Sequence, residues 1–301
     1  MNNNISVIIL TFNEEQHIKR CIESILTVTD NIFVIDSCSD DDTVVIAESL
    51  GAKVYQNAWP GNHAKQFQWG LDNCPIETEW VMKMDADEIV SPDLAKEIDS
   101  HLASVAKQVS GIYIKRRVNF MGRWIKHGGY YPTWLLRIWR YENGKIEQRW
   151  MDEHVKLTKG DTIRFEHDIV DDNKNDLTWW TQKHNNYSTK EAIDILNWIY
   201  GFKRYDEVEP AFFGSQEQRK RKLKHIYVRL PLFLRPLLYF VWRYFIKLGF
   251  LDGRQGLIWH FLQGFWYRFL VDAKVKEIYL KTGKNKAEIE RYLKEHYGVE
   301  F

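Results

Sequence analysis

Cysteine is scarce in this sequence: Cys21, Cys38 and Cys74 are the only three in 301 residues. No two of them form a CxxC pair and their number is odd, so the disulfide framework of a small secreted domain is not expected. The first residues, Met-Asn-Asn-Asn-Ile-Ser, also lack the basic stretch of a secretory signal. Both observations favour a reducing, cytoplasmic environment.

An excess of charge of either sign is missing as well. Lys and Arg number 42 against 41 Asp and Glu, which leaves a formal net charge of +1. Proteins that bind nucleic acid through their overall field carry a clear basic excess, so we expect no nucleic-acid partner. The hydrophobic fraction of 45% and the charged fraction of 28% are those of an ordinary folded protein.

A third absence is an uninterrupted run of the roughly 20 apolar residues that a membrane-spanning helix needs. The apolar stretch Leu230–Phe250 is broken by Arg235, Arg243 and Lys247. On a helix these cations fall within a sector of roughly 120°, opposite a broad apolar face. This pattern, followed by the apolar stretch Leu257–Val271, predicts attachment to an anionic membrane surface. The alternative is that both helices pack on the rest of the chain or on a second subunit, which would make a homo-oligomer.

Short apolar runs alternate with helical patterns through the first third of the chain. The runs that favour strands are Ile5–Leu10, Ile32–Ile35, Lys53–Gln56 and Trp80–Met84, and apolar residues at helical spacing follow each of the first three. The alternation predicts an α/β fold, a mostly parallel sheet with helices on both faces. Ligand sites in such sheets gather at the carboxyl ends of the strands.

Polar clusters follow three of these strands, at the point where each strand ends. They are Thr11-Phe12-Asn13-Glu14-Glu15, Asp36-Ser37-Cys38-Ser39-Asp40-Asp41-Asp42-Thr43 and Asp85-Ala86-Asp87-Glu88. The carboxylates of Asp85 and Asp87 repel each other unless a cation lies between them, and a hard divalent ion that carries substrate phosphates meets that need. The alternatives are helix capping for the first two clusters and a solvated acidic turn for the third.

The regular alternation ends after the fourth strand. We predict a helix from Pro92 to about Gln108, strands at Gly111–Asn119 and Leu135–Tyr141, a polar loop at His167–Asp176 and a helix at Thr178–Tyr200. A second acidic cluster, Asp152-Glu153-His154, precedes the predicted strand Val155–Leu157. This second layer is expected to form the far wall of a cleft.

In order and spacing, the three strand-end clusters resemble family 2 of the inverting nucleotide-sugar glycosyltransferases, which have the GT-A fold. The second half is similar to the branch that includes lipopolysaccharide-core glucosyltransferases, through His127-Gly128-Gly129-Tyr130-Tyr131-Pro132, Asp152-Glu153-His154 and Leu251-Asp252-Gly253. The resemblance implies transfer of a sugar from a nucleotide-diphosphate donor, a UDP-sugar, to a hydroxyl of a glycan or lipid-linked glycan. Such an enzyme would act in cell-envelope polysaccharide or lipopolysaccharide biosynthesis, in the cytoplasm and peripheral on the inner face of the cytoplasmic membrane.

Carried over position by position, the resemblance also implies roles for individual residues. The nucleotide would be bound by Thr11, Asn13, Glu14, Asp36, Lys65 and Asp85. A divalent cation, Mg²⁺ or Mn²⁺, would be held by Asp87 with Asp85 and His154, and either Asp152 or Glu153 would be the catalytic base. His127 and Arg137 would contact the acceptor or a phosphate, with packing or a salt bridge as the alternative for both.

The expected organisation is a GT-A catalytic domain over residues 1–200 and a helical, membrane-interfacial region over 201–301. Within the catalytic domain, residues 1–110 would bind the nucleotide sugar and 111–200 the acceptor. Three alternatives remain at this stage: a phosphohydrolase of the haloacid dehalogenase type, a nucleotidyltransferase, and an adaptor at the membrane surface that has lost catalysis. The first has an Asp-x-Asp nucleophile motif that normally ends in Thr or Val, where this chain has Ile89. The second needs a Gly-rich phosphate loop that the N-terminus lacks.

Overall fold

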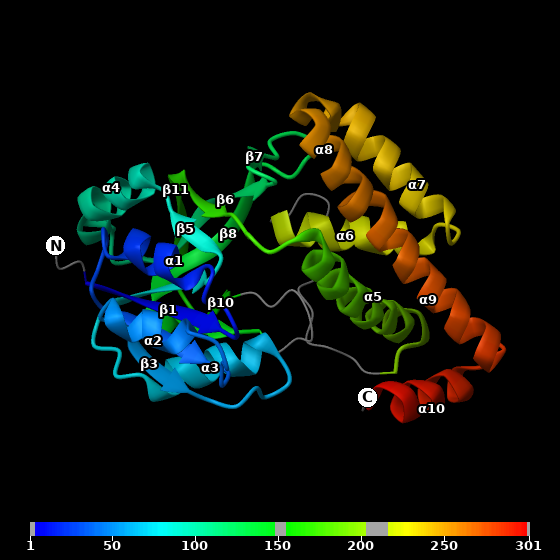
Figure 1. The fold of residues 1–301 in the computed structure, drawn as a ribbon, viewed down its shortest axis with the longest axis horizontal. Helices are drawn as coiled ribbons and strands as arrows, with labels where there is room; N and C mark the ends of the chain where they lie inside the picture. The colour runs from blue at the N-terminus through cyan, green and yellow to red at the C-terminus, as the bar shows by residue number, and fades with distance from the viewer. Residues whose placement is uncertain (1–3, 148–154, 203–215, 300–301) are drawn as a thin grey trace. The chain divides into compact units, whose positions relative to one another are not determined.

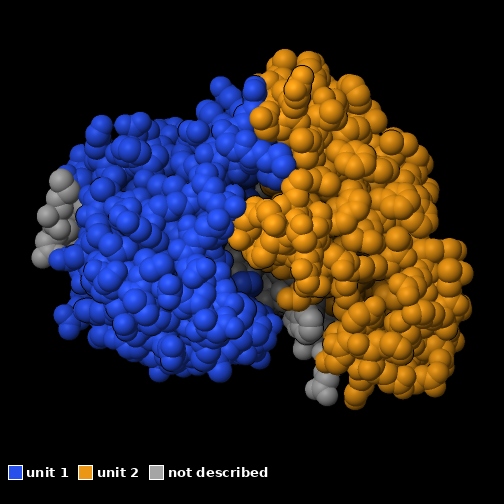
Figure 2. All heavy atoms as spheres, in the orientation of Figure 1, with its two compact units in different colours: residues 1–126, 130–174 blue, residues 127–129, 175–301 orange. Residues whose placement is uncertain are grey.

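The computed structural model describes residues 4–147, 155–202 and 216–299. The chain forms two compact units, coloured separately in Figure 2. Unit 1 comprises Met1–Lys126 and Tyr130–Lys174, and unit 2 comprises His127–Gly129 and Asn175–Phe301. All three cysteines are free, as their number and spacing predicted.

Unit 1 is built on one large sheet with the strand order β3-β2-β1-β4-β8-β6-β11-β5, and β7 pairs with β6 (Figure 1). The strands are β1 Ile5–Thr11, β2 Ile32–Asp36, β3 Lys53–Gln56, β4 Trp80–Asp85, β5 Glu88–Val90, β6 Val109–Phe120, β7 Arg123–Trp124, β8 Thr133–Arg140 and β11 Asp161–Asp171. The β3–β2, β2–β1, β1–β4 and β6–β11 pairs are parallel, whereas β8 runs antiparallel to both β4 and β6. The short strands β9 Gly144–Ile146 and β10 Val155–Leu157 form a separate antiparallel pair.

Helices cover both faces of this sheet, which confirms the predicted fold class. They are α1 Ile18–Ile25, α2 Thr43–Ser49, α3 His63–Asn73 and α4 Pro92–His101. Alternate residues of a strand point to opposite faces. Accordingly, the side chains of β1 divide between two cores: Val7 and Ile9 pack in the core that contains α1 and α4, while Ile8 packs with Phe67 of α3. A strand buried on both faces reads as a continuous apolar run, which is why β1 was recognisable in the sequence.

Two predicted elements of unit 1 are wrong. The helix expected to reach Gln108 ends at His101 and is followed by the 3₁₀ turn η1, Leu102–Ser104, before β6 begins. The loop expected at His167–Asp176 is strand over its first half, because β11 continues to Asp171. Asp171 pairs with Val118 of β6 on one side and with Glu88 of β5 on the other, and this pairing outweighs the low strand propensity of its polar residues.

Unit 2 is helical. Its elements are α5 Leu177–Tyr200, α6 Gln216–Arg229, α7 Leu234–Val241, the π-helical segment η3 Trp242–Ile246, the 3₁₀ turn η4 Gly249–Asp252, α8 Gly253–Trp259, the π-helical segment η5 His260–Trp266, α9 Tyr267–Thr282 and α10 Lys286–Tyr297. Helix α5 packs against α9 in a core that includes Leu196 and Val271. Residues 177–200 therefore group with the C-terminal helices, although we had placed them in the acceptor half of the catalytic domain. The functional division of the chain stays a prediction.

The cationic sector predicted for the stretch Leu230–Phe250 is wrong in one member. Arg235 is only 1% exposed, and its guanidinium donates to Asp272 Oδ1 from Nε at 2.8 Å. It also donates to the carbonyl of Val228 at 2.9 Å. A buried cation needs such partners, so Arg235 joins α7 to α9 and does not face a membrane. Within the described ranges, no helix is long and apolar enough to cross a membrane.

Candidate active site

The carboxyl ends of β1, β2 and β4 bring three of the predicted site residues into one row. Thr11 on β1 is in register with Asp36 on β2, and Leu10 is in register with Asp85 on β4. Paired strands lie roughly 4.8 Å apart, so the three strand ends are immediate neighbours. This edge is where open α/β sheets bind their ligands.

Asp36 is fully buried at this edge and holds the loop that follows β2. Its Oδ1 accepts hydrogen bonds from Thr11 Oγ1 at 2.8 Å and from Ser39 Oγ at 2.6 Å, and its Oδ2 accepts one from the Ser39 amide at 2.8 Å. Donors of this kind are what a carboxylate requires when it is removed from water. The loops after β1 and β2 are therefore fixed to one another at the base of the site.

Asn13 connects the same two loops further out. Its φ of 54° lies in the left-handed region, which asparagine tolerates better than most residues. Its side chain donates to Asp40 Oδ1 at 2.7 Å and accepts from the Asp40 amide at 3.1 Å. Helix capping, the alternative for these clusters, accounts for little of this arrangement. The N-cap residues of α1 and α2, His17 and Asp42, make no side-chain cap hydrogen bond, and Asp41 Oδ1 accepts from the Thr43 amide at the start of α2 at 3.0 Å.

Glu14 is joined to a part of the chain that the sequence did not predict to be nearby. Its Oε2 lies 2.6 Å from Nδ1 of the buried His17, and the Nε2 of His17 accepts from the Lys174 amide at 2.9 Å. The segment that follows β11 thereby packs beside the loop after β1. His17 and Lys174 are 157 positions apart, and no local pattern signals such a contact.

The acidic end of β4 is organised by Arg137 of β8, which is 5% exposed. Its Nη2 donates to Glu88 Oε1 at 2.5 Å and to Asp85 Oδ2 at 3.2 Å, and Glu88 Oε2 accepts from the Asp85 amide at 2.9 Å. One guanidinium thus holds two of the three acids of Asp85-Ala86-Asp87-Glu88. This is the salt-bridge alternative that we had kept for Arg137, and contact with the acceptor stays a prediction.

The two acids held by Arg137 have opposite pKa shifts. Burial opposes ionisation of Asp85, but the positive charges of Arg137 and Lys83 outweigh it and hold the pKa of Asp85 well below its usual range. Burial raises the pKa of Glu88, and the neighbouring charge of Asp85 adds to the rise although Arg137 opposes it. Asp85, whose side chain is 44% exposed, is therefore an ionised carboxylate open to a ligand, and Glu88 is a buried support.

Asp87 is fixed by the segment that follows β11. Its Oδ2 accepts from Asn173 Nδ2 at 2.9 Å, and its carbonyl accepts from the Asp172 amide at 3.1 Å. Asp172 itself is paired with Arg20 of α1 at 2.8 Å. Asn173 was not among the predicted site residues, because no local pattern in the polar stretch His167–Asp176 signals its contact with Asp87.

Asp85 and Asp87 together fit a divalent cation. Both offer carboxylate oxygens, which Mg²⁺ and Mn²⁺ prefer, and Mg²⁺ is usually bound through one or two carboxylates plus substrate phosphates and water. No group of three or more His, Cys, Asp or Glu side chains is arranged to hold a metal among the residues that the structure describes. The third predicted ligand, His154, lies outside the described residues.

The remaining predicted site residues are placed as follows. Lys65 is exposed on α3, where its amide donates to the N-cap side chain of Asn62 at 2.7 Å. His127 belongs to unit 2, where its Nδ1 lies 2.7 Å from Asp252 Oδ1 and its amide donates to Asp252 Oδ2 at 2.9 Å. Asp152, Glu153 and His154 lie outside the described residues, so their roles stay predictions.

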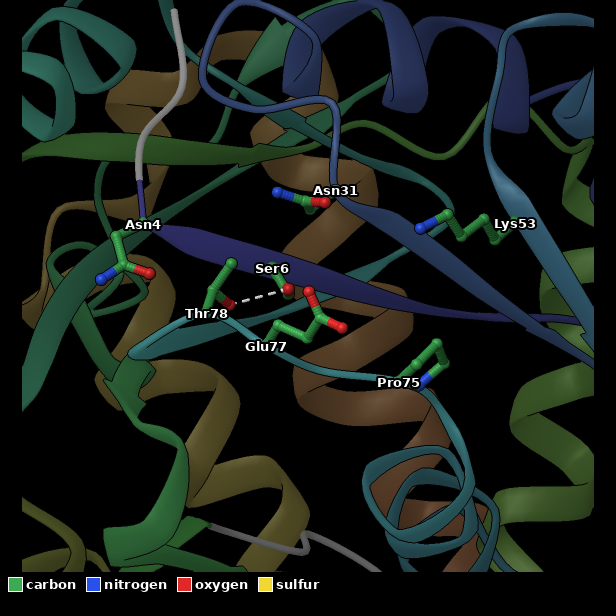
Figure 3. A pocket seen from close by; sticks show the side chains of 7 residues that line it. All are labelled: Asn4, Ser6, Asn31, Lys53, Pro75, Glu77 and Thr78. Atoms are coloured by element: carbon green, nitrogen blue, oxygen red, sulfur yellow. Dashed lines mark hydrogen bonds between the residues drawn. The ribbon is translucent and has the colours of Figure 1, made fainter.

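A polar depression of about 390 Å³ lies at the opposite end of the strands and is separate from these residues (Figure 3). It is lined by Asn4, Ser6, Asn31, Lys53, Pro75, Glu77 and Thr78. Asn4 and Ser6 are at the amino end of β1, where Thr78 Oγ1 donates to Ser6 Oγ at 2.8 Å. The depression therefore does not open at the strand ends that carry Asp36 and Asp85.

Comparison with known families decides what these strand-end residues belong to. Residues 6–162 match the sequence model of "Glycosyl transferase family 2". The chain belongs to this family. It is a glycosyltransferase, and the phosphohydrolase, nucleotidyltransferase and adaptor alternatives are set aside. The matched residues contain all three strand-end clusters.

Full-length relatives agree with this membership. An uncharacterized glycosyltransferase of Rickettsia typhi is 31% identical over 281 residues, which cover 92% of this chain and 88% of the relative. The lipopolysaccharide core biosynthesis glycosyltransferase LpsC of Rhizobium meliloti is 26% identical over 279 residues, 86% of this chain and 89% of the relative. Among solved structures, glucosyl-3-phosphoglycerate synthase from Mycobacterium tuberculosis, in complex with Mn²⁺, UDP and glucosyl-3-phosphoglycerate, matches 38% of this chain and 44% of that one. The identity of that match is 24% and its TM-score 0.32.

Proposed function

We propose that this glycosyltransferase moves a sugar, with inversion, from a UDP-sugar to a hydroxyl of a glycan or lipid-linked glycan in cell-envelope polysaccharide or lipopolysaccharide biosynthesis. The observation that carries the proposal is the row of strand ends with Thr11 beside Asp36 and an ionised Asp85 on the next strand. The similarity to LpsC favours a lipopolysaccharide acceptor over other glycans.

The chemistry assigns different tasks to the chain's two acidic clusters. Transfer of a glycosyl group passes through an oxocarbenium-like state in which the leaving diphosphate gains negative charge. A divalent cation, Mg²⁺ or Mn²⁺, supplies Lewis-acid stabilisation of that charge when bound, and Asp85 and Asp87 would hold it. Arg137 keeps the Asp85 carboxylate ionised and in one orientation through its bond to Oδ2. Asp152 or Glu153 would remove the acceptor proton from the side opposite the leaving group, which gives inversion in a single displacement.

Nucleotide binding is the direct test of this site. In titration calorimetry we expect uridine diphosphate to bind only when Mn²⁺ or Mg²⁺ is present. Asp87→Asn should abolish this metal-dependent binding. Asparagine keeps an oxygen that can accept from Asn173 but removes the charge that attracts the cation. Asp93→Asn is the matched control, because Asp93 is an exposed acid on α4 of the same unit. Equal binding of the nucleotide without metal would contradict the proposed site.

We also propose that unit 2 attaches the enzyme, a cytoplasmic protein, to the inner face of the cytoplasmic membrane. Support comes from a stripe of exposed apolar side chains at helical spacing along α7 and η3, namely Leu234, Leu237, Leu238, Val241, Trp242, Phe245 and Ile246, each between 39% and 60% exposed. Such a stripe normally faces the interior of a protein. Its exposure here favours contact with the apolar layer of a membrane.

A second exposed stripe lies beside the first. Leu257, Phe261 and Phe269 recur on α8, η5 and α9, and the ring of Phe261 lies 6.3 Å from that of Phe240 on α7. The one acid of residues 234–271 is Asp252, which is 2% exposed, whereas Lys247 and Arg254 are exposed. An apolar face bordered by cations alone fits the interface of a bilayer that contains anionic lipid.

Vesicle co-sedimentation tests this attachment. The triple change Trp242→Ser, Phe245→Ser and Ile246→Ser should lower binding to phosphatidylglycerol vesicles roughly tenfold or more, since each large apolar side chain contributes about 1.5–3 kcal/mol when fully buried. Leu280→Ser, at a 73% exposed position of α9 outside both stripes, is the control and should bind normally. Unchanged binding of the triple variant, with a change of oligomeric state instead, would assign the two stripes to a subunit interface.

A further inference from the structure

Unit 1 carries a series of aromatic rings and cations in contact with one another on β6, β7, β8, β11 and the loop between β7 and β8, which we call the cation–ring row. The Arg164 guanidinium lies 4.8 Å from the ring of Trp134, and Lys115 Nζ lies 5.5 Å from the same ring and 6.0 Å from that of Tyr131. Tyr131 meets Trp124 edge to face at 4.9 Å. The row ends with Arg117 at 4.7 Å and Lys126 at 5.2 Å from the Trp124 ring.

The register of the sheet explains why these side chains share one face. Lys115 of β6 pairs with Trp134 of β8, and Tyr113, two residues earlier on β6, pairs with Arg164 of β11. Side chains of paired residues, and of residues two apart on one strand, project to the same side of a sheet. Arg117, two residues beyond Lys115, therefore continues the row on the same face, and the strand part of the row follows from the register of the sheet.

The charge of this surface is strongly positive although that of the whole chain is close to zero. The row and the adjacent turn contribute Lys115, Arg117, Arg123, Lys126 and Arg164. Two acids touch the row within the described parts of the chain: Glu166, which lies 3.5 Å from Lys115, and Asp168, which accepts from the Tyr131 hydroxyl at 2.9 Å. Glu166 is 72% exposed, so it neutralises little of the charge. The surface is thus suited to an anionic ligand.

The row also lies near the acidic end of β4. Trp134 is three residues before Arg137 on β8, and Arg137 contacts Asp85. Three residues of a strand span roughly 10 Å, which is about the length of two sugar rings. A saccharide that lies along the row can therefore place one end close to the carboxylate row at the strand ends.

We infer that the cation–ring row binds the acceptor, and that the acceptor is a saccharide carrying phosphate or comparable anionic groups. Partly exposed aromatic rings offer flat apolar surfaces to the C–H faces of sugars, while Arg and Lys bind anionic oxygens, Arg through its two-pronged guanidinium. The presence of both kinds of group along one surface of the sheet matches a saccharide that carries anionic substituents. That the bound saccharide is the acceptor rests on the proposed glycosyl transfer. Binding of the saccharide to the row can be measured separately.

A purely structural role accounts for part of these observations only. Cation–π pairs at exposed sites contribute little stability each and need one cation per ring. Trp134 and Trp124 each have two cations within 6 Å, and this concentration of like charge costs energy unless an anion offsets it. Lipid headgroups are the other anionic partners in reach of this enzyme, and the experiment below separates them.

Titration calorimetry of the full chain with pentamannosyl phosphate tests the inference, with neutral mannopentaose and inorganic phosphate as comparison ligands. We expect the phosphorylated oligosaccharide to bind at least roughly tenfold more tightly than either, because neither ring contacts nor charge alone reproduces both interactions. Its affinity should also fall as sodium chloride is raised, whereas that of mannopentaose should not. Equal affinity for the neutral sugar, or binding of inorganic phosphate as tight as that of the oligosaccharide, would overturn the inference.

Variants locate the binding on the row. Arg117→Glu and Trp134→Ala should each weaken the binding of pentamannosyl phosphate roughly tenfold, and Arg117→Lys, which keeps the charge but loses the two-pronged donor, should weaken it less than Arg117→Glu. Lys96→Glu, the same charge change at an exposed position of α4, should have no effect. If Arg117→Glu leaves glycan binding intact but lowers binding to phosphatidylglycerol vesicles, the row contacts lipid and the inference is wrong. Binding of uridine diphosphate with Mn²⁺, measured in the same variants, reports separately on the proposed transferase function.

Discussion

Replacing the catalytic base should lower the turnover number by roughly 10²–10⁴-fold while leaving the affinity for the donor nucleotide unchanged. We expect this result from one of two variants, Asp152→Asn or Glu153→Gln, and a much smaller effect from the other. The reason is that an inverting displacement needs only a single carboxylate to take the acceptor proton. The amide side chains preserve size and polarity and remove only the basicity.

Kinetics against pH distinguish loss of the base from loss of structure. In the variant that lacks the base, the acidic limb of the rate profile should disappear, because that limb reports protonation of the base. Glu142→Gln is the control, since Glu142 is an exposed acid in the turn between β8 and β9. If both variants keep turnover within about twofold of the unaltered enzyme, the base lies elsewhere and the task assigned to the second acidic cluster is wrong.

The site residues that the sequence could predict are those in local patterns. Thr11, Asp36 and Asp85 each follow an apolar run that is buried on both faces, and such runs are recognisable one at a time. Parallel pairing then brings their ends together without further information. The first four strands were accordingly predicted to within one residue of their observed ends.

The residues that could not be predicted are held by contacts between distant parts of the chain. Asn173 reaches Asp87 across 86 positions, and Arg20 reaches Asp172 across 152. Both depend on β11, a polar strand that forms because β5 and β6 pair with its two edges. Sequence periodicity reveals helices and strands that bury an apolar face. Few residues of β11 are apolar, so its sequence looks like that of a loop. Whether such a segment forms a strand is decided by its pairing partners rather than by its residue types.

Arg235 illustrates the same limit in unit 2. A helical projection of its stretch groups Arg235 with Arg243 and Lys247, and nothing local distinguishes the three. The distinction comes from Asp272, 37 positions later on α9, which is itself fully buried. Burial of that acid demands a cation close by, and Arg235 supplies it. The exposed apolar stripe, not the cations, is therefore the stronger support for membrane attachment.

Loss of Arg137 should destabilise unit 1. Arg137→Met is expected to lower the free energy of unfolding by about 1–3 kcal/mol, because Glu88, which is 1% exposed and whose pKa burial already raises, would lose the guanidinium that donates to it. Methionine fills a similar volume, so the loss measures the charge more than a cavity. Urea unfolding, followed by circular dichroism, provides the measurement.

Two further variants assign that loss to the Arg137–Glu88 pair. Arg116→Met removes a neighbouring cation of β6 whose partner, Asp171, lies 3.6 Å away and is partly exposed; such pairs contribute at most about 1 kcal/mol. In the double variant Arg137→Met with Glu88→Gln, part of the lost stability should return, since glutamine needs no cation and its side-chain oxygen can still accept from the Asp85 amide. Metal-dependent nucleotide binding should not return with it, because Asp85 still lacks the guanidinium that orients it and keeps it ionised. Recovery of both properties together would mean that Arg137 acts only through Glu88 and has no part in preparing Asp85.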